Sequence, residues 1–213
     1  MAKDWLRWHE DYGTAGSSLA RRLEVVRAYL ERALTEALAG PDGQRRLISM
    51  CAGDGRDVLP VLARHPRGRA VRAVLAELDP ELARRARETA AELHLPDVDV
   101  RTGDAGRADT YRDTAPAHVL LACGVFGNIT GADVRRTVAA LPSLLVPGGI
   151  VIWTRGRGDG GPDASARVAD CFAEHGFHEL AFTSPSDARF RVGMHRLDGT
   201  GSQPVPDRLF TFI

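Results

Sequence analysis

The 213-residue sequence has no excess of charge of either sign, because 28 Lys and Arg residues balance 28 Asp and Glu residues. It therefore lacks the net field that holds a phosphate polymer or an anionic membrane through counterion release. Cysteine is also scarce: the three cysteines are odd in number, widely spaced and without a CxxC pair. This pattern predicts neither a disulfide framework nor a zinc site. We therefore expect no nucleic-acid partner and no bound metal.

Long apolar runs are absent as well. No stretch approaches the ~18 consecutive apolar residues of a membrane span, and the N-terminal MAKDWLRWHEDYG has no apolar signal-peptide core. These absences predict a cytoplasmic protein without a membrane partner. A content of 44% hydrophobic and 26% charged residues is typical of a globular chain. The length of 213 residues favours one large domain over two.

Short apolar runs alternate with segments of helical spacing along most of the chain. Apolar residues from Leu19 to Leu38 recur at intervals of three and four, which predicts a long helix after Ser17 that Gly40 ends. Strands are predicted at 47–51, 71–78, 98–101, 119–122 and 149–154, helices at 57–64, 80–93, 130–145 and 164–175, a hairpin at 177–183 and 190–196, and a short last strand at 209–213. This alternation predicts an α/β fold with a doubly wound, mainly parallel sheet.

The loops after the predicted strands carry the residues suited to bind a ligand. In an open α/β sheet, ligands bind outside the carboxyl ends of the strands, where glycines let the backbone approach closely. The first strand ends in Gly53-Asp54-Gly55, although a GxG turn alone is equally common as a structural turn. Glu77 follows Gly55 by 22 residues, close to the offset of about 20 expected of a carboxylate that holds ribose hydroxyls. Together they indicate a nucleoside site.

Two further loops extend this pattern. Asp104 and Ala105 follow the third strand, where a carboxylate and a backbone amide can read an adenine edge, and CGVFGN (123–128) follows the fourth. Four such loops in this order resemble those of the class I S-adenosylmethionine-dependent methyltransferases. The resemblance covers about residues 45–196 and includes LLVPGGIVIW and FAEHGFHELAF. The N-terminal WLRWHEDY extends it to uncharacterised, small-molecule-type members from actinobacteria.

The resemblance implies a seven-stranded sheet of order 3-2-1-4-5-7-6, with strand 7 antiparallel, within a single domain of residues 1–213. The cofactor-binding core would be 45–196, preceded by a helical cap at 1–40 and followed by a tail at 197–213. S-adenosyl-L-methionine is the implied cofactor and S-adenosyl-L-homocysteine its product. The implied cofactor-binding residues are Cys51, Ala52, Gly53, Asp54, Gly55, Asp57, Glu77, Leu78, Asp104, Ala105, Cys123, Gly124 and Val125.

Two residues depart from the family pattern. Ser49 stands where the family often has an acidic residue, and Cys51 stands where it often has its first glycine. The amino group of the cofactor therefore needs another partner, and Asp54 or Asp57 is available. Cys51 and Cys123 would end neighbouring strands, where we expect small packing residues rather than a redox pair.

A nicotinamide dinucleotide site is the main alternative. Its fingerprint requires a third glycine about three residues after Gly55, but that position is Val58. The chain also lacks GxxxxGK[ST], so a nucleoside triphosphate site is poorly supported. The sequence thus favours a methyltransferase over a nicotinamide-dependent oxidoreductase. A regulatory or non-catalytic protein that only binds the cofactor stays open as a second alternative.

The acceptor side is less constrained, because methyl transfer from a sulfonium mainly requires that the reactants are held in line and water is excluded. The loop after the fourth strand reads CGVF, whereas methyltransferases of nucleic-acid adenine or protein glutamine usually carry an NPPY-like tetrapeptide there. Together with zero net charge, this predicts a small-molecule acceptor methylated on O, N or S. Phe126, Asn128 and Arg155 are candidate acceptor contacts, and Asn128 is equally suited to a turn.

Four aromatic and imidazole side chains near the N-terminus share one helix face by their spacing: Trp5, Trp8, His9 and Tyr12. They predict either a helix packed on the domain or a lid over the site. As a lid, Trp5 and Trp8 would line the acceptor, and Tyr12 would bind the cofactor carboxylate. His9 would orient or deprotonate the acceptor, since histidine titrates near neutrality. We expect a monomer or a homodimer.

Overall fold

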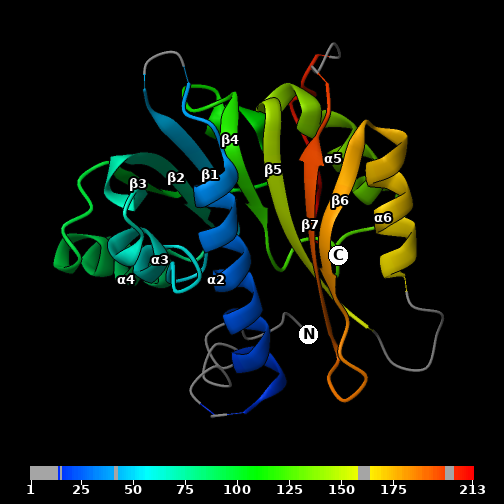
Figure 1. Ribbon diagram of the computed structural model, residues 1–213, viewed down its shortest axis with the longest axis horizontal. Coiled ribbons are helices and arrows are strands. Elements are labelled where there is room, and N and C mark those ends of the chain that lie inside the picture. Colours follow the sequence, from blue (N-terminus) through cyan, green and yellow to red (C-terminus); the bar gives the residue numbers. More distant parts are fainter. Residues whose placement is uncertain (1–13, 15, 41–42, 158–163, 200–203) are drawn as a thin grey trace.

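The computed structural model describes residues 14, 16–40, 43–157, 164–199 and 204–213. These residues build a seven-stranded sheet of order β3-β2-β1-β4-β5-β7-β6 (Figure 1). The neighbouring pairs from β3 to β5 are parallel, whereas β7 runs antiparallel to both β5 and β6. The strands are β1 (Arg45–Met50), β2 (Val71–Glu77), β3 (Val98–Thr102), β4 (Ala117–Ala122), β5 (Leu145–Gly156), β6 (Phe177–Thr183) and β7 (Phe190–Leu197). The predicted sheet order and the antiparallel seventh strand are confirmed.

Helices cover both faces of this sheet. One buried apolar cluster contains residues of α2 (Ser18–Glu36), α3 (Leu59–Arg64) and α4 (Pro80–Glu92), and the other contains residues of α5 (Gly131–Leu144) and α6 (Ser165–Glu174). Two short 3-10 helices, Gly68–Ala70 and Ala108–Tyr111, lie in connections. In Figure 1, α2 crosses the front of the sheet. The sheet is therefore doubly wound, as the alternation of strands and helices predicts.

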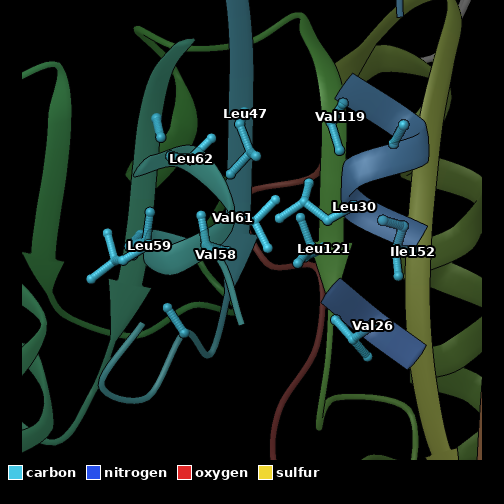
Figure 2. Close-up of a cluster of buried hydrophobic side chains, with 14 of the residues drawn as sticks. Val26, Leu30, Leu47, Val58, Leu59, Val61, Leu62, Val119, Leu121 and Ile152 are labelled. Carbon is cyan, nitrogen blue, oxygen red and sulfur yellow. The ribbon is translucent and has the colours of Figure 1, made fainter. Parts of the chain in front are cut away.

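Helix α2 forms because a capped segment with a continuous apolar face can pack across the sheet. The Ser17 side chain accepts a hydrogen bond of 3.0 Å from a backbone N–H of the first turn. Val26 and Leu30 are buried on its inner face, and Figure 2 shows them beside Leu121 of β4 and Ile152 of β5. Helix α2 is the described part of the predicted N-terminal cap at 1–40, and it belongs to the layer of helices that covers the sheet.

The C-terminal end of α2 lies before the predicted one. The helix stops at Glu36, and Ala37 is already extended. The Arg45 side chain donates a hydrogen bond of 3.0 Å from Nε to the Ala37 carbonyl, which satisfies one of the free acceptors at the helix end. Leu38 continues the apolar spacing but is 84% exposed. The predicted helix is too long because apolar spacing alone does not show that the Arg45 side chain of β1 caps the helix end.

The last residues of the chain do not form the predicted strand at 209–213. They make only isolated antiparallel bridges, from Arg208 to Arg107 and from Phe212 to Ile129. Leu209 is fully buried between these two contacts. The segment spans two loops rather than one strand edge, so no ladder of regular hydrogen bonds can form. Among the described residues, no helix is long and apolar enough to cross a bilayer.

Candidate functional site

A cavity of about 510 Å³ opens where β1, β2, β3 and β4 end, which is the edge at which open α/β sheets bind ligands. Its volume lies within the ~300–1,000 Å³ of small-molecule pockets. The predicted residues that line it are Cys51, Ala52, Gly53, Asp57, Glu77, Leu78, Asp104, Ala105, Cys123, Gly124 and Asn128. The structure therefore gathers the four predicted loops around one cavity.

Other predicted residues do not line this cavity: Asp54, Gly55, Val125, Phe126 and Arg155. Eight residues that were not predicted from the sequence also line the cavity: Arg22, Leu23 and Val26 of α2, Leu82 of α4, the loop residues Arg56 and Asp79, and Phe212 and Ile213 near the C-terminal end. The helical spacing of α2 predicts a buried face but not that its first half reaches a ligand site. No local sequence signal marks Phe212 and Ile213 as site residues, because they reach the cavity only through contacts with distant parts of the chain.

The loop after β1 is held in backbone conformations that favour glycine. Cys51, Gly53 and Gly55 have φ values of 57°, 58° and 75°. Cys51 thus takes the left-handed conformation at the position where the family pattern has glycine, at a cost of about 1–2 kcal/mol. A Cβ on Gly55 would lie 2.6 Å from Leu59 Cδ1 and 3.3 Å from Leu75 Cδ2. Gly55 therefore serves the packing of α3 on the sheet, while Gly53 lines the cavity.

Glu77 links the end of β2 to this glycine loop. Its Oε2 accepts a hydrogen bond of 2.7 Å from Gly53 N, and its Oε1 accepts one of 2.9 Å from Asp79 N. Each carboxylate oxygen has a second lone pair, so Glu77 keeps the capacity to accept from ligand hydroxyls. The carboxylate is therefore fixed on the cavity wall by the backbone of two loops.

The two aspartates of the first loop have different surroundings. Asp54 is paired with the Arg56 side chain, with Arg56 Nε donating to Oδ1 at 2.8 Å. Asp57 lines the cavity, and its Oδ1 is buried without a hydrogen-bond partner among the described residues. Burial raises the pKa of Asp57 to about 6, and repulsion from Asp54 adds to this shift. Of the two candidates, Asp57 is the carboxylate that a cationic ligand group in the cavity would stabilise.

Ser49 carries the second buried side-chain oxygen that lacks a hydrogen-bond partner in the described part of the chain. It is fully buried and stands one residue from the end of β1. Unsatisfied buried polar atoms are rare in native proteins and each requires an explanation. Both Ser49 and Asp57 belong to the segment that the family pattern assigns to the cofactor.

The loop after β3 is braced by the C-terminal part of the chain. Asp104 Oδ1 accepts a hydrogen bond of 2.8 Å from Gly106 N, and its Oδ2 pairs with Arg208 Nη1 at 2.8 Å. The neighbouring Ala105 is buried, and its carbonyl accepts a hydrogen bond of 2.8 Å from the Tyr111 hydroxyl. This loop therefore presents a carboxylate of fixed orientation at the cavity.

Polar groups of the loop after β4 are paired within the loop and with side chains of β5. Gly124 N donates to Thr154 Oγ1 at 2.8 Å, and Asn128 Nδ2 donates to the Gly124 carbonyl at 2.7 Å. Arg155 Nη1 donates to the Phe126 carbonyl at 2.5 Å. The Phe126 ring is fully buried in the aromatic core. Asn128 thus pairs within the turn at the cavity edge, whereas Phe126 and Arg155 support the loop and do not line the cavity. Their contact with an acceptor stays a prediction.

Cys51 and Cys123 line the cavity as neutral thiols. Burial raises the pKa of both, well above the ordinary value for Cys51. A thiol with a raised pKa is a poor nucleophile. This environment suits the packing role that the sequence favours.

Trp5, Trp8, His9 and Tyr12 lie outside the described residues, so the lid hypothesis stays a prediction. Within the described ranges, no group of three or more His, Cys, Asp and Glu side chains is arranged to hold a metal ion.

No protein-family model and no curated protein matches the chain, but many solved structures match it in fold. Magnesium protoporphyrin IX methyltransferase from Synechocystis PCC 6803, solved with bound S-adenosylhomocysteine, is 13% identical with a TM-score of 0.67. The match covers 92% of this chain and 94% of that one.

Two further structures show the same fold. An O-methyltransferase family protein from Burkholderia thailandensis is 16% identical with a TM-score of 0.64, over 86% of this chain and 57% of that one. The chain therefore spans little more than half of that protein. The [4+2]-cyclase SpnF is 16% identical with a TM-score of 0.61, over 79% of this chain and 80% of that one. The fold is that of the class I S-adenosylmethionine-dependent methyltransferases.

Proposed function

We propose that the protein is an enzyme that transfers a methyl group from S-adenosylmethionine to an O, N or S atom of a small molecule. The observation that carries this proposal is a cavity that gathers Gly53, Glu77 and Asp104 from three strand ends. Asp57 lines the same cavity, and its Oδ1 has no hydrogen-bond partner among the described residues. Structures of the same fold that contain S-adenosylmethionine or S-adenosylhomocysteine support the choice of cofactor.

The residues present fit this cofactor. Glu77 accepts from the ribose hydroxyls, and the backbone at Gly53 approaches the methionine portion. Asp104 and Ala105 bind the adenine, while Cys123 and Gly124 line the wall beside the methionine portion. In this proposal Gly55, Asp54 and Val125 shape the loops rather than touch the cofactor, because they do not line the cavity.

In this proposal Asp57 replaces the acidic residue that the family often has at the position of Ser49. Its buried Oδ1 lacks a partner in the described part of the chain, and a nearby positive charge such as an ammonium group favours the ionised form of a carboxylate. The cofactor carries such a group on its methionine portion. Asp57 therefore binds the α-ammonium in this proposal.

When bound, the cofactor supplies an electrophilic methyl group on a sulfonium. The protein holds the acceptor in line with this methyl group and excludes water, and residues of α2 and the four loops line the cavity in which this occurs. Trp5, Trp8, His9 and Tyr12 are proposed to complete the acceptor side. Zero net charge and the CGVF loop support a small acceptor over a polymer. We further propose a cytoplasmic monomer or homodimer without a nucleic-acid or membrane partner.

The proposal is tested by calorimetric titration of the purified protein with S-adenosylhomocysteine. Glu77→Ala is expected to weaken binding by about tenfold to hundredfold, because two charge-assisted hydrogen bonds to the ribose are lost. Glu77→Gln keeps one acceptor oxygen for Gly53 N but sets an amide N–H against Asp79 N, so urea unfolding of both variants is measured to separate ligand binding from damage to the loop. Glu179→Ala, at an exposed position of β6, is the control and leaves affinity unchanged. A wild-type protein that does not bind S-adenosylhomocysteine overturns the proposal.

The role of Asp57 has its own test. Asp57→Asn is expected to weaken S-adenosylhomocysteine by about tenfold or more, since a charge pair with the ammonium is lost. The same change leaves 5′-methylthioadenosine unaffected, because this nucleoside has no ammonium group. Equal losses for the two ligands contradict an ammonium site at Asp57.

A non-catalytic or differently catalytic protein is the second candidate function, since a cyclase shares this fold. It predicts normal S-adenosylhomocysteine binding without methyl transfer to any acceptor in a metabolite screen. The nicotinamide alternative is weaker in the structure as well, because Val58 is fully buried in the core at the position of the third fingerprint glycine. Binding of NADH in place of S-adenosylhomocysteine would restore it.

A further inference from the structure

The C-terminal segment, residues 208–213, is attached to the loop that follows β3. Arg208 forms an antiparallel bridge with Arg107 and pairs with Asp104 through Nη1 at 2.8 Å. Leu209 N donates to the Gly106 carbonyl at 2.8 Å. A Cβ on Gly106 would lie 2.3 Å from the carbonyl oxygen of Phe210. The approach of the two backbones thus requires glycine at position 106.

The same segment is attached to the start of α5 and to the loop that follows β4. The Leu209 carbonyl accepts hydrogen bonds from Thr137 Oγ1 at 3.0 Å and Arg136 Nε at 3.2 Å. Phe212 bridges to Ile129, and Ile213 N donates to the Asn128 carbonyl at 3.1 Å. Two fixed ends and a buried middle make this segment a defined part of the cavity wall.

Exposed apolar side chains are concentrated at this cavity. Five large apolar side chains are exposed in the described part of the chain, and three of them, Leu78, Phe212 and Ile213, line the cavity. Leu78 is 64% exposed and Phe212 is 37% exposed. Exposed apolar surface gathered at a concave site indicates a ligand that covers it.

Leu78 and Phe212 line the same cavity, and each lies next to residues of a different core cluster. Leu78 precedes α4, whose inner side packs in the cluster shared with α2 and α3. Phe212 follows Phe210, which belongs to the cluster on the other face, and the two rings meet edge to face with centroids 5.4 Å apart. Asp104 lines the cavity together with both residues. A flat ring bound between Leu78 and Phe212 would therefore share the cavity with the Asp104 carboxylate.

We propose that the C-terminal segment is part of the nucleoside-binding site, with Phe212 packing on the face of the adenine opposite Leu78. Arg208 is a positioning residue, which orients the Asp104 carboxylate toward the 6-amino group of the base. This inference rests on the proposed function. An ionised carboxylate only accepts hydrogen bonds, so an oriented Asp104 selects a 6-amino base over a 6-oxo base.

The role of Phe212 is tested by titrating two ligands, S-adenosylhomocysteine and 5′-methylthioadenosine, into Phe212→Ala. Loss of a stacked aromatic ring is expected to weaken both ligands by the same factor, about fivefold to 150-fold. Phe212→Tyr retains the aromatic ring, so its affinities for both ligands are expected to equal those of the wild type. Phe182→Ala is the matched control, because Phe182 on β6 is 39% exposed and does not line the cavity.

Unchanged affinity of Phe212→Ala for both ligands overturns the inference, and so does a loss limited to S-adenosylhomocysteine. These results leave the proposed function intact, provided that Glu77→Ala weakens binding. Failure of the wild type to bind S-adenosylhomocysteine is instead a failure of the proposed function.

The role of Arg208 is tested through base selectivity, which a merely structural contact would not change. The wild type is expected to prefer 5′-methylthioadenosine over 5′-methylthioinosine, which has a 6-oxo group. Arg208→Ala is expected to reduce this preference at least fivefold, and Arg208→Lys to restore part of it. Arg21→Ala removes an ion pair with Asp187 at a residue that does not line the cavity and leaves the preference unchanged. An Arg208→Ala variant with the wild-type preference overturns the positioning role.

Discussion

The loops that follow the neighbouring strands β1 and β4 border the same cavity but differ in how their polar groups are satisfied. In the loop after β4, Gly124 N, the Gly124 carbonyl and the Phe126 carbonyl all have partners within the protein. In the segment around the β1 loop, Asp57 Oδ1 is buried without a partner among the described residues, and Cys51 takes a left-handed backbone conformation. Strain and unsatisfied groups of this kind cluster at functional sites.

The two loops thus differ in whether their polar groups are paired before a ligand binds. The β4 loop needs no ligand for these three groups, because one bond lies within the loop and two come from side chains of β5. The β1 loop keeps a buried carboxylate at a cost in stability, which a bound ammonium group would recover. Substitutions in the two loops test this contrast.

Gly55→Ala and Gly124→Ala compare the two loops at glycines of similar conformation, with φ values of 75° and 77°. A Cβ at Gly55 would clash with Leu59, whereas a Cβ at Gly124 meets no atom within 4 Å. Gly55→Ala is expected to lower the free energy of unfolding by about 3–5 kcal/mol, from backbone strain and overpacking together. Gly124→Ala is expected to cost about 1–2 kcal/mol from strain alone. Urea unfolding measures both, and equal losses would contradict the role of Gly55 in packing α3.

Asp57→Asn is expected to stabilise the ligand-free protein at pH 8. Because burial raises the pKa of Asp57 from 3.8 to about 6, the folded state holds a proton that the unfolded state releases between these values. The stability contributed by this group is therefore present below pH 4 and lost as the pH rises through about 6, by roughly 2–3 kcal/mol. The variant removes this loss, so urea unfolding of variant and wild type should diverge with rising pH. Asp54→Asn, whose carboxylate is already paired with Arg56, should not gain stability at pH 8.

Asn128→Ala removes a hydrogen bond that the β4 loop makes with itself. Loss of the bond to the Gly124 carbonyl is expected to lower the free energy of unfolding by about 1 kcal/mol. Affinity for S-adenosylhomocysteine is expected to change less than threefold in calorimetric titration, since this side chain supports the loop. A loss of affinity with unchanged stability would show that Asn128 contacts a ligand.

Cys51→Gly and Cys123→Gly compare the two cysteines of the cavity. Glycine relieves the positive φ at Cys51, and this gain offsets the lost side chain to leave a net change within about 1 kcal/mol. Cys123 does not have a positive φ, so Cys123→Gly loses packing and backbone order and costs about 1–2 kcal/mol. Thermal unfolding of both variants measures the difference, and a larger loss at Cys51 would rule out strain at that position.

Much of the fold follows from local patterns. Short apolar runs, helical spacing and loop glycines predict the strands and helices, and the family resemblance supplies the sheet order that the structure confirms. Errors occur where a distant part of the chain decides the outcome. Leu38 leaves the helix because Arg45 caps the Ala37 carbonyl, and 209–213 is no strand because it spans two separate loops.

The sequence by itself determined which loops form the cavity, because residues directly after parallel strands necessarily meet at one edge of the sheet. It did not choose between Asp54 and Asp57, because that choice depends on burial and on the pairing of Asp54 with Arg56. It also contained no sign that Arg208 pairs with Asp104, 104 positions earlier, or that Phe212 reaches the same cavity. Only the tertiary structure decided these contacts, because they join segments whose proximity arises from the packing of the whole chain.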